Sequence, residues 1–138
     1  MEVGTRVWCS ADTKSDDAWF LAEVLVKGDT ELKLQQVDKK ENVFTRPKAA
    51  TTEEGDTHKF EGVELSNTPL SDQDRADGLD NDLITLPHLH EPAILHSVSD
   101  RFFHGKIYTW TGPVLIAVNP FQRLPLYTEV SSAISTRI

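Results

Sequence analysis

The chain has 138 residues, with 14 Lys and Arg against 22 Asp and Glu, and its formal net charge is −8 at pH 7. This length allows one ordinary domain or two small ones. Residues 51–82 hold ten acidic and two basic residues, whereas residues 1–50 and 83–138 are nearly balanced in charge. The acidic excess therefore lies in the middle of the chain, and no basic patch supports a nucleic-acid partner.

Cysteine content and hydropathy predict the compartment. Cys9 is the only cysteine, so no internal disulfide can form and a reducing, intracellular setting is expected. The chain opens without a charged and apolar leader, and no apolar run approaches the ~20 residues that span a bilayer. We therefore expect a soluble, cytoplasmic protein without a membrane span.

Residues 3–47 alternate short runs rich in Val, Leu, Phe and Trp with polar turn segments. The runs are Thr5–Cys9, Trp19–Val26, Glu31–Val37 and Asn42–Thr45. Lys27-Gly28-Asp29 has the composition of a hairpin turn between the second and third runs. Strands at this spacing predict a small closed β-barrel over residues 3–48. Its expected inward-facing set is Val7, Phe20, Ala22, Val24, Leu32, Leu34, Val37 and Val43.

Four aromatic residues in this region, Trp8, Trp19, Phe20 and Phe44, leave two interpretations open. They could line a groove for a polyproline peptide, or converge as a cage for a methylated lysine. More commonly, aromatic residues in a barrel of this size fill the core and pack at its rim. Cys9 has no histidine or second cysteine close to it in sequence, so an inert strand thiol is predicted.

Residues 49–82 show little hydrophobic periodicity and are predicted to be a flexible acidic linker. Within them, the tract Ser71–Asp82 contains alternating acidic residues. It lacks the glycine and glutamate spacing of a calcium-binding loop, so no calcium site is expected there.

A helix is predicted to begin near Glu91-Pro92 and to stop at Gly105. Proline is tolerated in a first helical turn, an acid suits the positive end of the helix dipole, and glycine is common just past a helix end. Apolar residues at intervals of three and four predict one buried stripe. Its members are Ile94, Leu95, Val98 and Phe102.

Four histidines lie in or before this helix, and they raise the question of a zinc site. They are His88, His90, His96 and His104. Two would lie in a loop and two on the helix, eight residues apart, with no cysteine or carboxylate at ligand spacing. We therefore predict solvated or capping histidines and no metal site.

Two further β runs, Ile107–Trp110 and Val114–Val118, are joined by the turn segment Thr111-Gly112-Pro113. Val114–Val118 is the longest uninterrupted apolar run in the sequence. Because it is apolar at both odd and even positions, it predicts a strand in the middle of a layered sheet. The loop Asn119–Tyr127 would leave the carboxyl end of this strand, where functional loops of α/β proteins lie.

Four short motifs follow one another in the second half of the chain. They are Glu91–His96 (EPAILH), Ile107–Gly112 (IYTWTG), Ala117–Phe121 (AVNPF) and Leu124–Tyr127 (LPLY). The order and spacing of these motifs resemble the first block of the myosin motor head. The chain closely resembles myosin heavy chains over residues 83–128, and more loosely over residues 3–47.

This resemblance implies a β plus α/β fold in three parts. Residues 3–48 would form a Src-homology-3-like barrel, and residues 49–82 the acidic linker. Residues 83–138 would start the motor domain, with the first helix and β-hairpin of a P-loop NTPase-type head, truncated before the phosphate loop.

The resemblance also implies that Asn119, Pro120, Arg123 and Tyr127 form the purine-binding loop for ATP. Pro120 and Tyr127 offer rigid faces for adenine, Asn119 offers donors and an acceptor, and Arg123 can stack on the base or supply charge. No stretch of the 138 residues fits the phosphate-loop pattern G-x-x-x-x-G-K-[ST]. No catalytic residue is therefore assigned, and ATP with Mg²⁺ is expected only for the complete motor.

The implied function is that of an amino-terminal fragment of an actin-based motor at the cytoplasmic actin cytoskeleton. Its partners would be actin filaments and light chains, bound through regions outside this chain. The alternative is a free-standing barrel that binds a peptide or a methylated lysine. The isolated chain is also expected to self-associate, because Val114–Val118 needs cover that one helix and one neighbouring strand do not supply.

Overall fold

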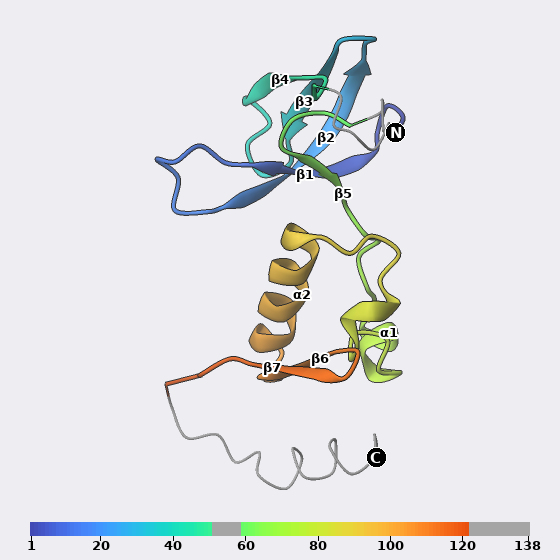
Figure 1. Cartoon of the computed structure of the whole chain (residues 1–138), viewed down its shortest axis with the longest axis vertical. Coiled ribbons are helices and arrows are strands. Elements are labelled where there is room, and N and C mark those ends of the chain that lie inside the picture. The colour runs from blue at the N-terminus through green and yellow to red at the C-terminus, as the bar shows by residue number, and fades with distance from the viewer. Residues whose placement is uncertain (51–58, 122–138) are drawn as a thin grey trace, which may run out of the picture. The chain divides into compact units, whose positions relative to one another are not determined.

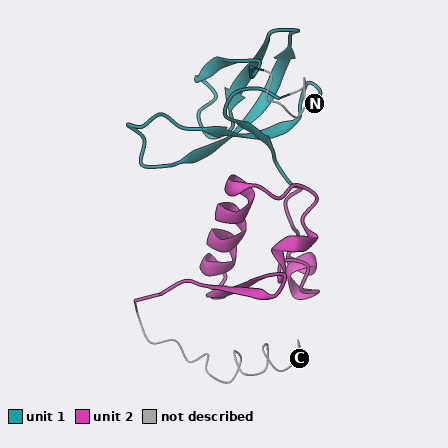
Figure 2. Ribbon diagram, in the orientation of Figure 1, with its two compact units in different colours: residues 1–67 teal, residues 68–138 magenta. Residues whose placement is uncertain are grey.

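The computed structural model describes residues 1–50 and 59–121 of the chain (Figure 1). The chain divides into two compact units, Met1–Asn67 and Thr68–Ile138 (Figure 2). Strands predominate over helices in the described residues. Each unit has its own sheet.

The first unit is an antiparallel sheet with the strand order β4-β3-β2-β1-β5. The four strands predicted from residues 3–47 are confirmed, with small shifts at their ends. The fifth was not predicted, because three residues are too few to show a period-two pattern. The strands are β1 (Arg6–Ser10), β2 (Trp19–Lys27), β3 (Glu31–Gln36), β4 (Val43–Pro47) and β5 (Val63–Leu65).

Hydrogen bonds join the two edges of this sheet, so that it curls round on itself as a small barrel does. The chain after β4 pairs with the chain before β5 through a bridge between Lys48 and Phe60, and the Ala49 N–H donates to the Lys59 carbonyl at 2.9 Å. Gly62 lies at this closure with φ +63°, and a Cβ there would lie 2.1 Å from the Ser10 Oγ. Only glycine fits this close approach.

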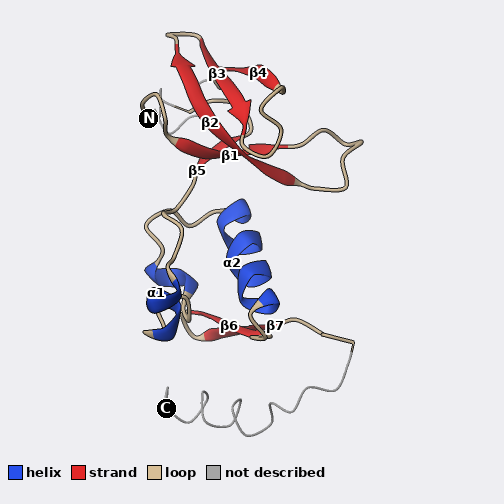
Figure 3. Cartoon of the chain, turned by 180° about the vertical axis from the view of Figure 1, so that it is seen from behind, coloured by secondary structure: helices blue, strands red, loops and turns tan. Residues whose placement is uncertain are grey.

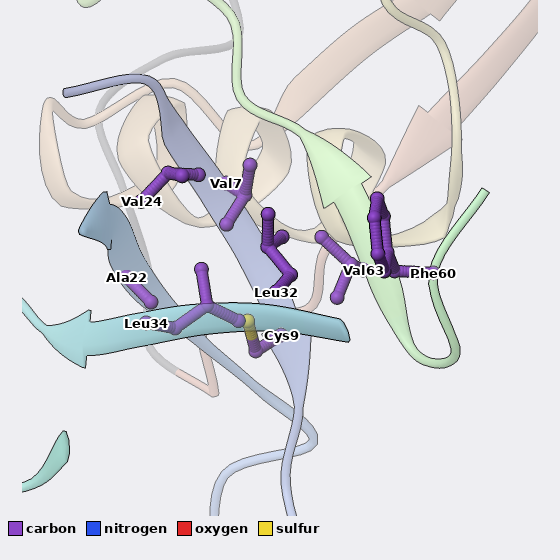
Figure 4. Packing of buried hydrophobic residues seen from close by; sticks show 8 residues of the cluster. All are labelled: Val7, Cys9, Ala22, Val24, Leu32, Leu34, Phe60 and Val63. Carbon is purple, nitrogen blue, oxygen red and sulfur yellow. The ribbon is translucent and has the colours of Figure 1, made fainter. Parts of the chain in front are cut away.

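The core of the first unit lies between the strands, where the buried side chains point toward one another (Figure 4). Five members of the predicted inward set are fully buried, and Phe20 packs against them. Val43 was predicted wrongly, since it is 43% exposed. It pairs with Gln35, so β-strand alternation turns the next residue, Phe44, toward the core instead. The buried residues are Val7, Cys9, Ala22, Val24, Leu32, Leu34, Phe60 and Val63.

The second unit contains short helices and one hairpin (Figure 3). The predicted helix is confirmed as α2 (Glu91–Phe103), which the His90 Nδ1 caps by accepting the Ala93 N–H at 3.2 Å. The other elements are α1 (Asp72–Ala76), the 3₁₀ helix η1 (Leu83–Thr85), β6 (Tyr108–Thr111) and β7 (Val114–Ala117).

One member of the predicted helix stripe is misplaced. Leu95 is 51% exposed, and the buried position that follows Val98 on the helix face is taken by Arg101, which is only 7% exposed. A charged residue thus continues a stripe that begins with apolar side chains. It can do so because the residues around it supply hydrogen-bond partners.

The hairpin confirms the turn predicted at Thr111-Gly112-Pro113, since Thr111 pairs with Val114 across a two-residue loop. Gly112 has φ +59° and the φ of Pro113 is fixed negative by its ring, the combination of a type II′ turn. The structure differs from the expected position of β7 in the middle of a layered sheet. In the part of the chain that is described, β7 pairs with β6 alone, and Val114 is 58% exposed.

The acidic stretch before α2 also differs from the flexible linker expected there. β5 lies within it, and Ser71 caps α1 in a reciprocal arrangement with Asp74. Asp80 is buried, and Asp82 accepts the Gly112 N–H at 3.0 Å, joining this stretch to the hairpin turn. Composition alone could not predict the contacts of Asp80 and Asp82, because their partners Arg101 and Gly112 lie 21 and 30 residues later in the sequence.

Asp80 and Arg101 form the centre of the second unit. The Arg101 Nη1 lies 3.1 Å from the Asp80 Oδ2 and 3.1 Å from the Asn81 Oδ1. Its Nε donates to the Thr109 Oγ1 at 3.1 Å, and its Nη2 to the Tyr108 carbonyl at 2.7 Å. One guanidinium therefore holds together the end of α2, the segment before η1 and strand β6.

The position of β5 generates a prediction about the extent of the first unit. A chain ending at Lys48 lacks the buried side chains of Phe60 and Val63, each worth about 1.5–3 kcal/mol on burial. We expect its free energy of unfolding to be about 3–6 kcal/mol below that of a chain ending at Asn67. Urea unfolding followed by tryptophan fluorescence measures this difference. Equal midpoints and slopes would show that the barrel closes without β5.

The buried ion pair generates a second prediction. Arg101→Met leaves the Asp80 carboxylate buried with only Lys106 nearby, and should cost about 3–5 kcal/mol of unfolding free energy. Adding Asp80→Asn to Arg101→Met should restore part of this loss, because no buried charge remains. Urea unfolding of the three variants forms the test.

The matched control is Arg75→Met, since Arg75 pairs with the exposed Asp72 and the partly exposed Asp100. Its cost should be at most about 1 kcal/mol. An Arg101→Met variant as stable as this control would contradict the central role of the ion pair.

Candidate nucleotide-binding loop

The exit of β7 places Asn119 and Pro120 directly beyond the hairpin. The last bond of the hairpin runs from the Val118 N–H to the Ile107 carbonyl at 2.9 Å. The Asn119 Oδ1 then accepts the Phe121 N–H at 2.8 Å, which closes a tight turn around Pro120. Phe121 has φ +53°, a conformation that residues other than glycine rarely adopt. The direction of the loop is thus fixed at its first residues.

Only part of the predicted purine-binding set falls within the described residues. Asn119 is exposed and Pro120 is half-buried, and they are adjacent at the strand exit. Arg123 and Tyr127 lie outside the described residues, so their place in the loop stays a prediction.

The two described residues have the chemistry that a base-binding loop requires at its start. Pro120 offers a rigid apolar face to a flat ring. The Asn119 Oδ1 is engaged by the turn, while its Nδ2 belongs to an exposed side chain and can donate to a ring nitrogen. The backbone turn orients this amide, so little conformational freedom would be lost on binding.

The residues that hold the strand before this loop in place were not predicted from the sequence. β7 is held by β6, and β6 is held by Arg101 through Tyr108 and Thr109. The Trp110 N–H donates to the Asn81 carbonyl at 3.1 Å on the other edge of β6. One feature of the sequence pointed to them: Arg101 occupies a position of α2 where the apolar stripe calls for an apolar residue.

The four barrel aromatics do not share one face of the sheet. The Phe20 and Phe44 rings meet edge to face with centroids 5.4 Å apart, and both pack against the core. Trp8 neighbours the buried Val7 and Cys9 in β1, so strand alternation turns it to the outer face. Trp19 precedes Phe20 in β2 and by the same rule faces away from it.

A cation already lies over one of these rings. The Arg46 guanidinium carbon is 5.5 Å from the centroid of Phe44, and its Nη2 donates to the Ser10 carbonyl. A ligand groove on the barrel stays a prediction, and the arrangement of Phe20 and Phe44 also suits plain core packing.

No group of three or more His, Cys, Asp or Glu is placed to hold a metal ion within residues 1–50 and 59–121. His90 caps α2, and the His104 Nδ1 lies 2.7 Å from the Asp100 carbonyl. Among the described helices, none is long and apolar enough to cross a membrane.

The single cysteine, Cys9, lies in the core of the first unit, where burial disfavours its thiolate form. Burial raises the pKa of the Cys9 thiol from 9.0 to about 11, and the nearby Arg46 charge partly opposes this shift. Since the thiolate is the reactive form, Cys9 is unreactive near neutral pH.

Comparison with known proteins identifies the family. The family described as "Myosin head (motor domain)" matches residues 80–135. Unconventional myosin-Vb of Mus musculus is 35% identical over 131 residues, which cover 91% of this chain and 6% of that protein. The chain belongs to the myosin family.

Two other myosins extend the comparison. Myosin-13 of Arabidopsis thaliana is 32% identical over 130 residues, which cover 94% of this chain and 7% of that protein. Unconventional myosin-Va of Gallus gallus is 50% identical over 62 residues, covering 44% of this chain and 3% of its own length. The chain thus spans less than a tenth of the length of these myosins. The myosin-head match begins at Asp80, so it includes the Asp80–Arg101 ion pair and the residues that accept hydrogen bonds from Arg101.

The raised pKa of Cys9 generates a prediction with a defined pH window. The folded pKa of about 11 lies above the ordinary thiol pKa of 9.0, so the buried neutral thiol contributes stability below pH 9.0. This contribution should be lost as the pH rises through about 11. Urea unfolding across that range measures it, and Cys9→Ala should lack this component of the loss.

The same shift predicts slow thiol labelling of the folded chain near neutral pH, and fast labelling after unfolding. Rapid labelling of the folded chain would show that Cys9 is not buried.

Proposed function

We propose that this chain forms the amino-terminal part of an actin-based myosin motor and supplies the purine-side contacts for ATP. The observation that carries the proposal is the match to unconventional myosin-Vb over 91% of the chain. In this proposal residues 3–48 are a Src-homology-3-like barrel, residues 49–82 join it to the head, and residues 83–138 begin the motor domain.

The proposed nucleotide contacts are Asn119, Pro120, Arg123 and Tyr127. Support comes from the Asn119 turn, which presents an amide and the Pro120 ring at the end of a strand held by the ion-pair network. ATP with Mg²⁺ would bind to the complete motor, because no phosphate-loop pattern occurs in these 138 residues. Bound ATP would supply the phosphoryl group, while these residues would orient only the adenine.

The proposed partners and location follow from the family. Actin filaments and light chains would bind regions outside this chain, and the complete protein would act at the cytoplasmic actin cytoskeleton. These activities belong to the whole motor, of which the chain corresponds to a small part.

A chimera tests the nucleotide role. Residues of this chain replace the matched 131-residue segment of Mus musculus unconventional myosin-Vb, and actin-dependent ATP turnover is measured. Asn119→Ala and Tyr127→Ala should each raise KM for ATP roughly fivefold to tenfold, since each removes about one hydrogen bond or ring contact. kcat should change little, because the adenine contacts are the same before and during phosphoryl transfer.

The matched control is Val43→Ala, an exposed barrel residue that should leave KM and kcat unchanged. An active chimera in which neither Asn119→Ala nor Tyr127→Ala changes KM would remove the purine-loop assignment. A chimera without ATP turnover, despite folding normally, would count against the motor assignment itself.

A further inference from the structure

Asp82 contacts two elements of the second unit with one carboxylate oxygen. It is the N-cap of η1, where its Oδ1 accepts the Ile84 N–H at 3.2 Å. The same oxygen accepts the Gly112 N–H at 3.0 Å, in the turn of the hairpin that β6 and β7 form. The Ile84 Cδ1 lies 3.7 Å from the position that a Cβ on Gly112 would occupy. One half-buried side chain therefore joins the start of η1 to the hairpin turn.

The main chain before η1 follows β6 along the edge that faces away from β7. Asp82 and Trp110 form a parallel bridge, and the Trp110 N–H donates to the Asn81 carbonyl at 3.1 Å. Asn81 and Asp82 thus lie beside the hairpin as a very short third strand. The Asp82 side chain continues this contact to the turn.

Strand β6 is held at both of its ends. Near its start, Arg101 donates to the Thr109 Oγ1 and to the Tyr108 carbonyl. Just past its end, the turn residue Gly112 donates to Asp82. A strand held at one place can rotate about that contact, whereas a strand held at two places has a fixed direction. Two-stranded ribbons twist more strongly than larger sheets, so the second contact restricts a rotation that the hairpin would otherwise allow.

The direction of β6 determines that of the nucleotide loop through β7. The two strands pair along their whole length, and the Val118 N–H donates to the Ile107 carbonyl just beyond them. Asn119 leaves β7 at the end where Arg101 holds β6, so a rotation of the hairpin would turn Asn119 and Pro120 more than it would shift them. A hydrogen bond weakens when its donor is turned away from the acceptor, and contact with a flat ring requires a parallel face.

We propose that Asp82 is a positioning residue for the purine-binding loop and acts through the hairpin turn. The inference rests on the proposed nucleotide role of Asn119 and Pro120, and extends it to a residue that would not touch the nucleotide. A carboxylate suits this role, because a hydrogen bond to a charged acceptor is roughly twice as strong as a neutral one.

Three substitutions of Asp82 separate the cap of η1 from the contact with the turn. Asp82→Asn keeps an acceptor oxygen in the same place, so both contacts remain. Asp82→Ser keeps a good N-cap, but its shorter side chain withdraws the oxygen from the Gly112 N–H. Asp82→Ala removes both contacts. In the 138-residue chain, the Gly112 amide should exchange about tenfold faster in Asp82→Ser than in Asp82→Asn. Equal rates would show that Asp82 does not hold the turn.

The chimera with unconventional myosin-Vb of Mus musculus measures the effect on nucleotide. Asp82→Ser should raise KM for ATP roughly fivefold, since the adenine contacts become misaligned. kcat should change little, because these contacts are the same before and during phosphoryl transfer. Asp82→Asn should stay within about twofold of the unaltered chimera in KM. A loss of stability alone would reduce the amount of active motor, which lowers the apparent kcat and leaves KM unchanged.

A double variant tests whether Asp82 acts through the loop. Asp82→Ser combined with Asn119→Ala should raise KM by less than the product of the two single effects, because both changes weaken the same contact. The matched control is Asp72→Ser, which removes an exposed carboxylate from the same acidic stretch. It should leave KM and kcat unchanged.

The outcomes separate this proposal from the nucleotide role itself. If Asn119→Ala raises KM and Asp82→Ser does not, Asp82 has no positioning role, while the purine-loop assignment stands. Single effects that multiply in full would show that Asp82 acts on ATP by another route, and would also overturn the proposal. If neither Asn119→Ala nor Tyr127→Ala changes KM, the purine-loop assignment is wrong and the role of Asp82 falls with it.

Discussion

Arg101 and Asp80 form an ion pair whose side chains are 8% and 5% exposed. Withdrawing two charges from water is costly, and their attraction compensates only when the remaining donors are also satisfied. The Arg101 guanidinium meets this condition with bonds to Asn81, Thr109 and the Tyr108 carbonyl. Because the guanidinium is planar and its donors have fixed directions, these partners fix the position of α2 against β6. Lysine could not make the same set of contacts.

The sequence predicted the helices, strands and turns more accurately than the contacts between residues that are distant in sequence. The β runs, the start of the helix at Glu91 and the turn at Gly112 were all correct, because they depend on neighbouring residues. Val43 was misplaced because a one-residue change of register exchanges the two faces of a strand. Asp80 was assigned to a linker because its partner, Arg101, lies 21 residues later in the sequence. Of the nucleotide loop, Asn119 and Pro120 could be placed, while the chemistry of Arg123 and Tyr127 rests on the family resemblance.

The proposed nucleotide loop depends on the strand from which it leaves the sheet. The loop uses the direction in which the chain leaves β7 at Asn119, which the Val118 bond to Ile107 fixes. This direction depends in turn on the bonds from Arg101 to β6, so the Asp80–Arg101 ion pair supports the exit of the strand.

The two units differ in the composition of their cores, and this difference determines how the stability of each varies with temperature. The first unit buries eight hydrophobic residues in one cluster, whereas the described part of the second buries Leu83, Pro92 and Ala93 alongside Asp80, Arg101 and Thr109. Exposing apolar surface raises the heat capacity on unfolding, while exposing polar surface lowers it. The stability of the second unit should therefore vary less steeply with temperature, and its cold denaturation should lie further from the working range than that of the barrel.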